Sequence, residues 1–108
     1  MKERCGIMWK PFDYGKTIST KGSENGIIIK DEEYKEIARI TLEKDEYTPY
    51  GITCGIYGMM CHTVFAGGHD EALGKYEAMK QEIGQFFDAG IGSDDEISDW
   101  AATFTSKW

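Results

Sequence analysis

A run of 22 residues without a charged side chain, from Tyr47 to Gly68, constrains the fold of this chain more than any other feature. Asp, Glu, Lys and Arg make up 29% of the whole chain, so an uncharged run of this length is conspicuous. Such a segment can lose its water on every side, because it carries no charge whose burial must be compensated. The sequence therefore predicts that this run forms the centre of a β-sheet.

Two strands fit this run better than a helix does. A membrane-spanning helix needs about 20 predominantly apolar residues, whereas ten of the 22 residues here are Gly, Pro, Thr or His. A soluble helix is disfavoured because each interior glycine costs about 1 kcal/mol relative to alanine. Since strands are usually about 5–6 residues long, we expect one strand at about 50–56 and the next at about 59–66. One continuous strand bent at Gly58 is the alternative.

The second of these strands is apolar on both faces apart from His62 and Thr63. Strands that are buried on both faces occur inside sheets, where each edge is paired. We therefore expect the strand at 59–66 to lie in the interior of the sheet.

Two further strands are expected earlier in the chain. Three consecutive isoleucines are typical of a short buried strand at about 27–30, and the charged residues from Lys30 to Glu33 are expected to begin the connection that follows. The segment Tyr34–Lys44 alternates from Ala38 to Glu43, which favours a strand at about 36–44. In that strand the side chains expected to face water are Lys35, Arg39, Thr41 and Glu43. A helix capped by Asp31 is the alternative for the same segment.

Two helices are expected after the sheet. Apolar residues at steps of three and four predict a helix over His69–Ala89; they are Ala72, Tyr76, Met79, Ile83 and Phe86. A capping box, with Ser93 at the N-cap and Glu96 three residues on, predicts a second helix at about 94–107. The fold class is therefore α+β, an antiparallel sheet of three to four strands packed by two C-terminal helices.

The 108 residues are expected to form one domain, 1–108, with a less regular N-terminal arm at 1–26. Glycines and Pro11 interrupt every period in this arm, but its aromatic residues are too apolar for a simple disordered tail. We expect those aromatics to lie on the body of the domain. The alternative is that the arm docks on another chain, such as a second copy in a homo-oligomer.

Charge and cysteine content limit the partners and the location of the protein. The net charge is −7, which disfavours binding to nucleic acid and to anionic membranes, since both depend on Lys and Arg. The three cysteines are an odd number, and the charged N-terminus is unlike a signal peptide. We therefore expect reduced thiols and a cytoplasmic location.

Cys54, Cys61 and His62 are the candidate reactive residues. A thiolate activated by histidine is a nucleophile, which makes these residues a possible site for a small-ligand-binding protein or an enzyme. Buried cysteine more often behaves as a small apolar residue, so both thiols are expected to be buried and slow to react. Neither the cysteine nor the histidine spacing is that of a zinc site. No metal and no cofactor are expected.

The second candidate surface is acidic. Residues 81–106 contain six Asp or Glu and no Lys or Arg, and the acids at 94–99 stand beside Trp100. Acid around an aromatic residue is a plausible face for a cationic protein. The binding candidates are Asp94, Asp95, Asp99 and Trp100. We therefore expect a non-catalytic, inhibitor- or immunity-like domain that engages a basic partner protein.

Overall fold

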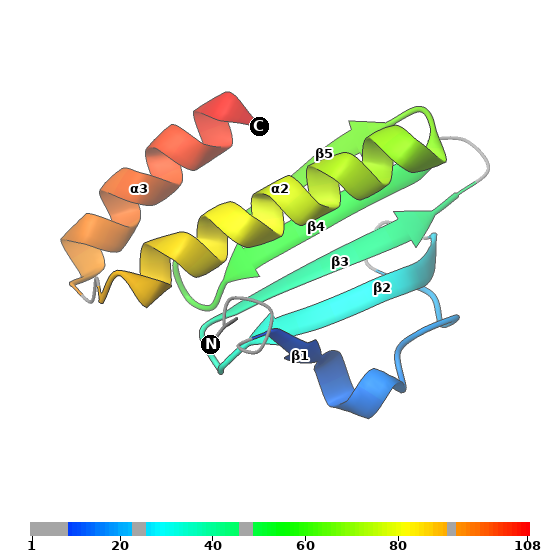
Figure 1. Cartoon of the computed structure of the whole chain (residues 1–108), viewed down its shortest axis with the longest axis horizontal. Helices are drawn as coiled ribbons and strands as arrows, with labels where there is room; N and C mark the ends of the chain where they lie inside the picture. Colours follow the sequence, from blue (N-terminus) through cyan, green and yellow to red (C-terminus); the bar gives the residue numbers. More distant parts are fainter. Residues whose placement is uncertain (1–8, 23–25, 46–48, 91–92) are drawn as a thin grey trace, which may run out of the picture.

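The computed structural model describes residues 9–22, 26–45, 49–90 and 93–108. Its centre is a five-stranded antiparallel sheet in which each strand pairs with the next along the chain (Figure 1). The strands are β1 (Trp9–Pro11), β2 (Ile27–Tyr34), β3 (Ala38–Lys44), β4 (Tyr50–Ile56) and β5 (Met60–Ala66). A 3-10 helix, η1 (Phe12–Gly15), follows β1, and the helices α2 (His69–Asp88) and α3 (Asp94–Lys107) follow β5. The predicted α+β class is confirmed, with one strand more than expected.

The uncharged run forms a hairpin of two strands, so the alternative of one bent strand is wrong. β4 and β5 pair in continuous register from Tyr50 opposite Ala66 to Ile56 opposite Met60. The turn between them places Gly58 at a φ of 77°, a left-handed conformation that glycine adopts without steric cost. Tyr47 and Thr48, at the start of the run, lie outside the described residues.

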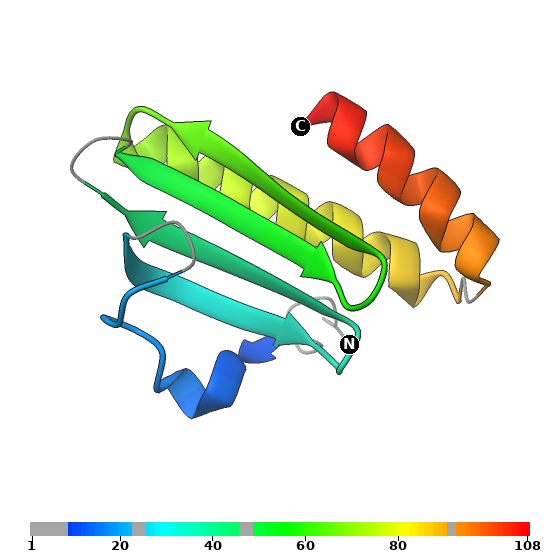
Figure 2. The same cartoon turned by 180° about the vertical axis from the view of Figure 1, so that it is seen from behind.

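The predicted interior position of the second strand is wrong, because β5 ends the sheet. Among the described residues it pairs with β4 alone. Helix α3 contacts β5 and runs alongside its outer side, beyond the edge of the sheet (Figures 1 and 2). A helix beside a sheet edge shields it, which explains how a strand without charged residues can occupy this position.

The strand expected at 27–30 extends to Tyr34, so the predicted charged connection from Lys30 to Glu33 is part of β2. The register shifts between Ile28 and Lys30, which places a bulge in the strand. β3 begins at Ala38, and the helical alternative for this segment is wrong. Two β3 residues expected to face water, Thr41 and Glu43, are instead buried.

Helix α2 packs against β3, β4 and β5, and this side of the sheet is called the helix face below. The predicted apolar stripe of α2 is fully buried at Ala72, Tyr76, Met79 and Ile83, whereas Phe86 is half-buried. The capping box of α3 is confirmed, because the backbone N–H of Glu96 donates to the Ser93 hydroxyl at 3.1 Å. The opposite side of the sheet is called the open face.

The N-terminal arm covers part of the sheet, as expected for two of its aromatic residues. Trp9 is buried in an edge contact with Tyr34, with ring centroids 5.4 Å apart. Phe12 lies against Arg39, whereas Tyr14 is 92% exposed. Antiparallel backbone hydrogen bonds then join residues 19–22 to residues 26–28. Docking of the arm on another chain stays a prediction.

Candidate functional site

The three predicted reactive residues lie on β4 and β5 but on two faces of the sheet. Cys54 and His62 are direct cross-strand partners on the helix face. Cys61 pairs with Gly55, and its thiol is exposed on the open face. The structure therefore brings Cys54 and His62 together and separates Cys61 from them. The expectation that both thiols are buried is right for Cys54 and wrong for Cys61.

The surroundings of Cys54 keep its thiol protonated. Burial raises the pKa of Cys54 to about 12, and the nearby Cys61 adds to this rise. The thiolate is the reactive form of cysteine, so a thiol with this pKa is a poor nucleophile at neutral pH. The Nε2 atom of His62 is buried and has no hydrogen-bond partner among the described residues. Cys54 therefore has the environment of a packed core side chain, and His62 is half-buried beside it.

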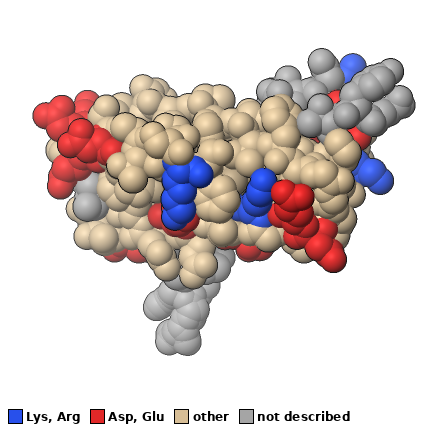
Figure 3. Space-filling model, turned by 90° about the horizontal axis from the view of Figure 1, so that it is seen from above, with Lys and Arg blue, Asp and Glu red and all other residues tan. Residues whose placement is uncertain are grey.

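The predicted acidic candidates lie on the first turns of α3. Asp94, Asp95 and Asp99 are all exposed, and Figure 3 shows a cluster of acidic side chains at the end of the molecule where α3 begins. The basic residue in the last turn of this helix, Lys107, pairs with Glu82 at 2.7 Å. In the described part of the chain, none of the three aspartates forms an ion pair.

Trp100, the fourth binding candidate, is half-buried and packs between two aromatic rings. Its ring stacks on Phe86, with centroids 4.6 Å apart and an interplanar angle of 19°. It also stacks on Phe104, at 4.7 Å and 25°. Because two aromatic rings stack on the indole, Trp100 is a packing residue that joins α3 to α2. The three aspartates remain as the solvent-facing members of this candidate site.

Negative charge is concentrated in the helical part of the chain. Residues 69–108 contain three Lys against nine Asp or Glu, a net charge of −6, whereas residues 1–68 contain nine Lys or Arg against ten Asp or Glu, a net charge of −1. All three helical lysines are committed to ion pairs: Lys75 with Glu71, Lys80 with Glu32 and Glu77, and Lys107 with Glu82. The acidic residues that are left without a lysine partner among the described residues therefore include those at the start of α3.

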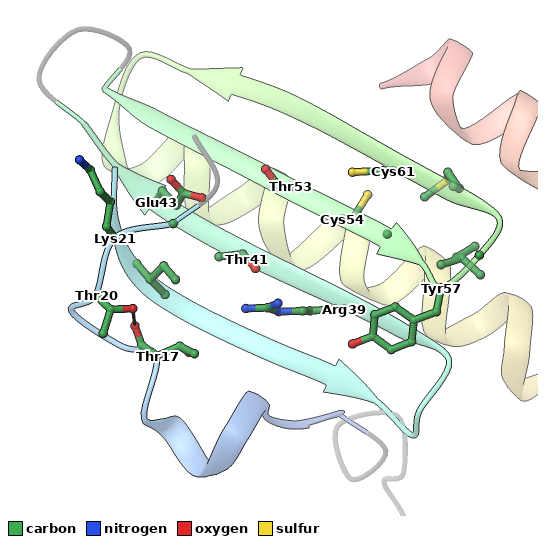
Figure 4. Close-up of a pocket in the computed structure, with 16 residues that line it drawn as sticks. Thr17, Thr20, Lys21, Arg39, Thr41, Glu43, Thr53, Cys54, Tyr57 and Cys61 are labelled. Carbon is green, nitrogen blue, oxygen red and sulfur yellow. Dashed lines mark hydrogen bonds between the residues drawn. The ribbon is translucent and has the colours of Figure 1, made fainter. Parts of the chain in front are cut away.

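The structure also contains a feature that sequence analysis missed, a cavity of about 430 Å³ on the open face. Figure 4 shows it between the sheet and the folded-back segment of the arm. Side chains of β3, β4 and β5 form its floor, and residues 17–22 form one wall. The floor includes Arg39, Thr41, Thr53 and Cys61.

A partly buried ion pair anchors this cavity. Arg39 donates to Asp31 through Nε at 2.9 Å and through Nη2 at 2.6 Å. Thr17 and Thr41 donate to the same carboxylate at 2.7 and 3.3 Å. The bonds to Asp31 raise the pKa of Arg39 above its usual value, and the guanidinium lies 3.7 Å from the centre of the Phe12 ring. Arg39 is therefore a fixed, permanent cation on the cavity floor.

Tyr57 stands at the rim of the cavity and is half exposed. Its hydroxyl donates to the Glu33 carboxylate at 2.7 Å. Burial, followed by this hydrogen bond, raises the pKa of Tyr57 to about 12. The phenol is therefore neutral at physiological pH and acts as a hydrogen-bonding group.

No group of three or more His, Cys, Asp or Glu in the described ranges is placed to hold a metal ion. Within those same ranges, the helices are too short or too polar to cross a membrane. No protein-family model, curated protein or solved structure matches this chain.

Proposed function

We propose that this chain is a non-catalytic binding protein whose acidic surface at the start of α3 engages a basic partner, in the manner of an inhibitor or immunity protein. The observation that carries the proposal is the position of the surplus charge. Residues 69–108 hold a net charge of −6, and the exposed aspartates of α3 have no ion-pair partner among the described residues. Exposed charges of one sign attract partners of the opposite sign and accelerate their encounter.

The way in which α3 is attached supports this use of its surface. The stack of Phe86, Trp100 and Phe104 fixes the helix to α2. The ion pair between Lys107 and Glu82 adds a second attachment near the other end of the helix. The three aspartates are thereby held on a positioned helix, so a partner would meet a fixed arrangement of charge.

The proposal includes a cytoplasmic location, which one observation supports. Cys54 and Cys61 are both free thiols, and reduced cysteines are kept in that state in the cytoplasm. Fractionation of the source cell, followed by detection of the protein in each fraction, tests this part.

Capture of partners from the source cell tests the main proposal. The bait is the full chain, compared with the triple variant Asp94→Asn, Asp95→Asn and Asp99→Asn. A matched control neutralises three exposed acids elsewhere, Asp13→Asn, Glu36→Gln and Asp70→Asn, so that the net charge is the same. We expect a basic protein on the wild-type and control baits and its loss from the triple variant. Equal recovery of the basic protein on all three baits would show that the acidic surface of α3 does not bind it.

A second candidate function is small-ligand binding in the open-face cavity. Its volume of about 430 Å³ is within the range of about 300–1,000 Å³ that small-molecule sites occupy. Of the three reactive residues predicted from the sequence, Cys61 has its thiol on this face of the sheet and lines the cavity. The thiol of Cys54 lies on the helix face, and its raised pKa disfavours covalent chemistry there.

A further inference from the structure

Arg39 has a free hydrogen-bonding edge. A guanidinium carries five N–H donors in a planar fork. Asp31 occupies the side-on edge, formed by Nε and Nη2. The end-on edge, formed by the remaining hydrogens of the two Nη atoms, has no partner among the described residues. The side chain of Arg39 is 33% exposed and lines the cavity, so this second edge is accessible to a ligand there.

Two of the acids near the cavity, Asp31 and Glu43, already accept hydrogen bonds within the protein. The side chain of Asp31 is fully buried, and Glu43 is 2% exposed with its Oε1 accepting from the Gly26 N–H at 3.0 Å. Both carboxylates are therefore engaged within the protein, whereas the end-on edge of Arg39 is open to a ligand in the cavity.

The neighbouring hydroxyl groups have already committed their hydrogens to other acceptors. Thr17 and Thr41 donate to Asp31, Thr20 donates to the Thr17 carbonyl, and Tyr57 donates to Glu33. Since a hydroxyl carries one hydrogen, these groups can only accept from a ligand. Of the cavity-lining side chains, Arg39 and Lys21 keep hydrogen-bond donors for a ligand, and Arg39 is the one held in place by an ion pair.

The geometry points to a small monocarboxylate as the ligand of this cavity, bound end-on by the free edge of Arg39. This inference rests on the second proposed function, ligand binding in the cavity, and is independent of the acidic surface of α3. Guanidinium and carboxylate match as two parallel hydrogen bonds, which gives direction as well as affinity. Ile28, which also lines the cavity, provides carbon surface for the rest of the ligand.

Charge favours a single carboxylate over a more highly charged anion. The charges of Arg39 and Lys21 balance those of Asp31 and Glu43, so a monoanion adds one negative charge to a neutral site, whereas a phosphate adds up to two. The surrounding residues 1–68 carry a net charge of only −1. The larger negative charge belongs to the helices, and α2 lies on the other side of the sheet (Figure 1). Repulsion from it is weakened by distance and by salt.

Rigidity of the anchor also supports the inference. The guanidinium is held by a bidentate ion pair on one edge and by the Phe12 ring on one face. A side chain that is already fixed loses little entropy when a ligand binds, so more of the interaction energy appears as affinity.

Titration of the full ¹⁵N-labelled chain with sodium benzoate tests the inference, with backbone shifts as the readout and ionic strength held constant. We expect saturable shifts at Arg39, Thr41, Thr53 and Tyr57, with a dissociation constant on the order of 1 mM for a ligand of this size. Arg39→Lys keeps the charge but loses the fork, and should weaken binding at least tenfold. Absence of saturable shifts with benzoate would overturn the inference.

A second variant separates ligand binding from the stability of the ion pair, because Arg39→Lys also loosens the contact with Asp31. Cys61→Phe narrows the cavity from β5 and leaves Arg39 and Asp31 unchanged. It should weaken benzoate binding at least tenfold, whereas Ser98→Phe, an equally bulky change at an exposed α3 position, should leave binding unchanged. Wild-type affinity in the Cys61→Phe variant would contradict the placement of the ligand.

Three further probes separate failure of the ligand class from failure of the site. Benzamide is the uncharged analogue, benzylamine the cationic one and inorganic phosphate the multivalent anion; the inference predicts that each binds at least tenfold more weakly than benzoate. If any of them shifts the cavity residues and benzoate does not, the carboxylate is wrong and ligand binding in the cavity stands. If none of the four shifts these residues, the second proposed function fails as well.

Discussion

Thr17 in the N-terminal arm donates a 2.7 Å hydrogen bond to Oδ2 of Asp31, a residue 14 positions later in β2. The same oxygen accepts from Nη2 of Arg39 at 2.6 Å. One buried carboxylate therefore holds together the arm, β2 and β3. It adds side-chain bonds to the backbone pairing that already joins the arm to β2.

We expect Asp31→Asn to destabilise the protein by about 3–5 kcal/mol, since it removes the charge that compensates Arg39 in a partly buried pair. Glu36→Gln removes one negative charge from an exposed position in the β2–β3 turn and should change stability by less than about 0.5 kcal/mol. Denaturant midpoints measure both. Equal midpoints for the two variants would show that the Asp31 contact contributes nothing to folding.

The buried stripe of α2 gives a second prediction. Met79 and Ile83 are fully buried, so Met79→Ala or Ile83→Ala should cost about 2–5 kcal/mol. Gln81→Ala, at an exposed position between them, should cost less than about 0.5 kcal/mol. Urea denaturation measures the free energy of unfolding of the three variants. A larger loss of stability for Gln81→Ala than for the other two would contradict the assignment of Met79 and Ile83 to the buried side of the helix.

The two thiols should differ in reactivity. Cys61 is exposed and Cys54 is buried, with a pKa raised to about 12, so a thiol reagent at neutral pH should label Cys61 rapidly and Cys54 only after denaturation. Mass spectrometry of labelled peptides, in a Cys5→Ser background, distinguishes the two sites. If Cys54 in the native protein is labelled as fast as Cys61, Cys54 and His62 become a candidate reactive site again.

Stability should fall at high pH in part through Tyr57. Its pKa is raised from 10 to about 12 in the folded protein, so between these values the unfolded chain has lost a proton that the folded chain keeps. Stability from this group is therefore complete below pH 10 and is lost as the pH rises towards about 12. Tyr57→Phe should show a smaller loss of stability than wild type between about pH 9 and about pH 11.5. Parallel curves for the two proteins would contradict the assignment.

Local pattern was enough to predict β4, β5, α2 and α3. The uncharged run and the steps of three and four are properties of neighbouring residues, and each reports burial directly. The capping box of Ser93 and Glu96 likewise lies within a single turn. β1 was missed because it has three residues and ends at Pro11, which leaves no period to detect.

The errors in β2 and β3 share one physical cause. Charged residues there were assigned to water, but their charges are compensated by residues distant in sequence. Glu32 accepts from the Tyr76 hydroxyl at 2.7 Å and from Lys80 at 3.0 Å, partners 44 and 48 positions away. The sequence pattern likewise predicts that Arg39 faces water, because its ion pair with Asp31 forms only when β2 and β3 pair. The cavity that Arg39 lines could therefore not be predicted. The edge position of β5 was missed because its cover, α3, comes 28 residues after the strand ends.

The acidic surface of α3 is the central claim, and association kinetics with the captured partner test it most directly. Stopped-flow rates are measured at low and at physiological salt for wild type, the Asp94, Asp95 and Asp99 triple variant, and the matched Asp13, Glu36 and Asp70 control. The account predicts that wild-type and control association slow steeply with salt, since exposed charges are screened over about 10 Å at 0.1 M. It also predicts that the triple variant associates more slowly and loses this dependence, while its dissociation rate changes little. An association rate that is independent of salt, or a triple variant that associates as fast as the control, would contradict it.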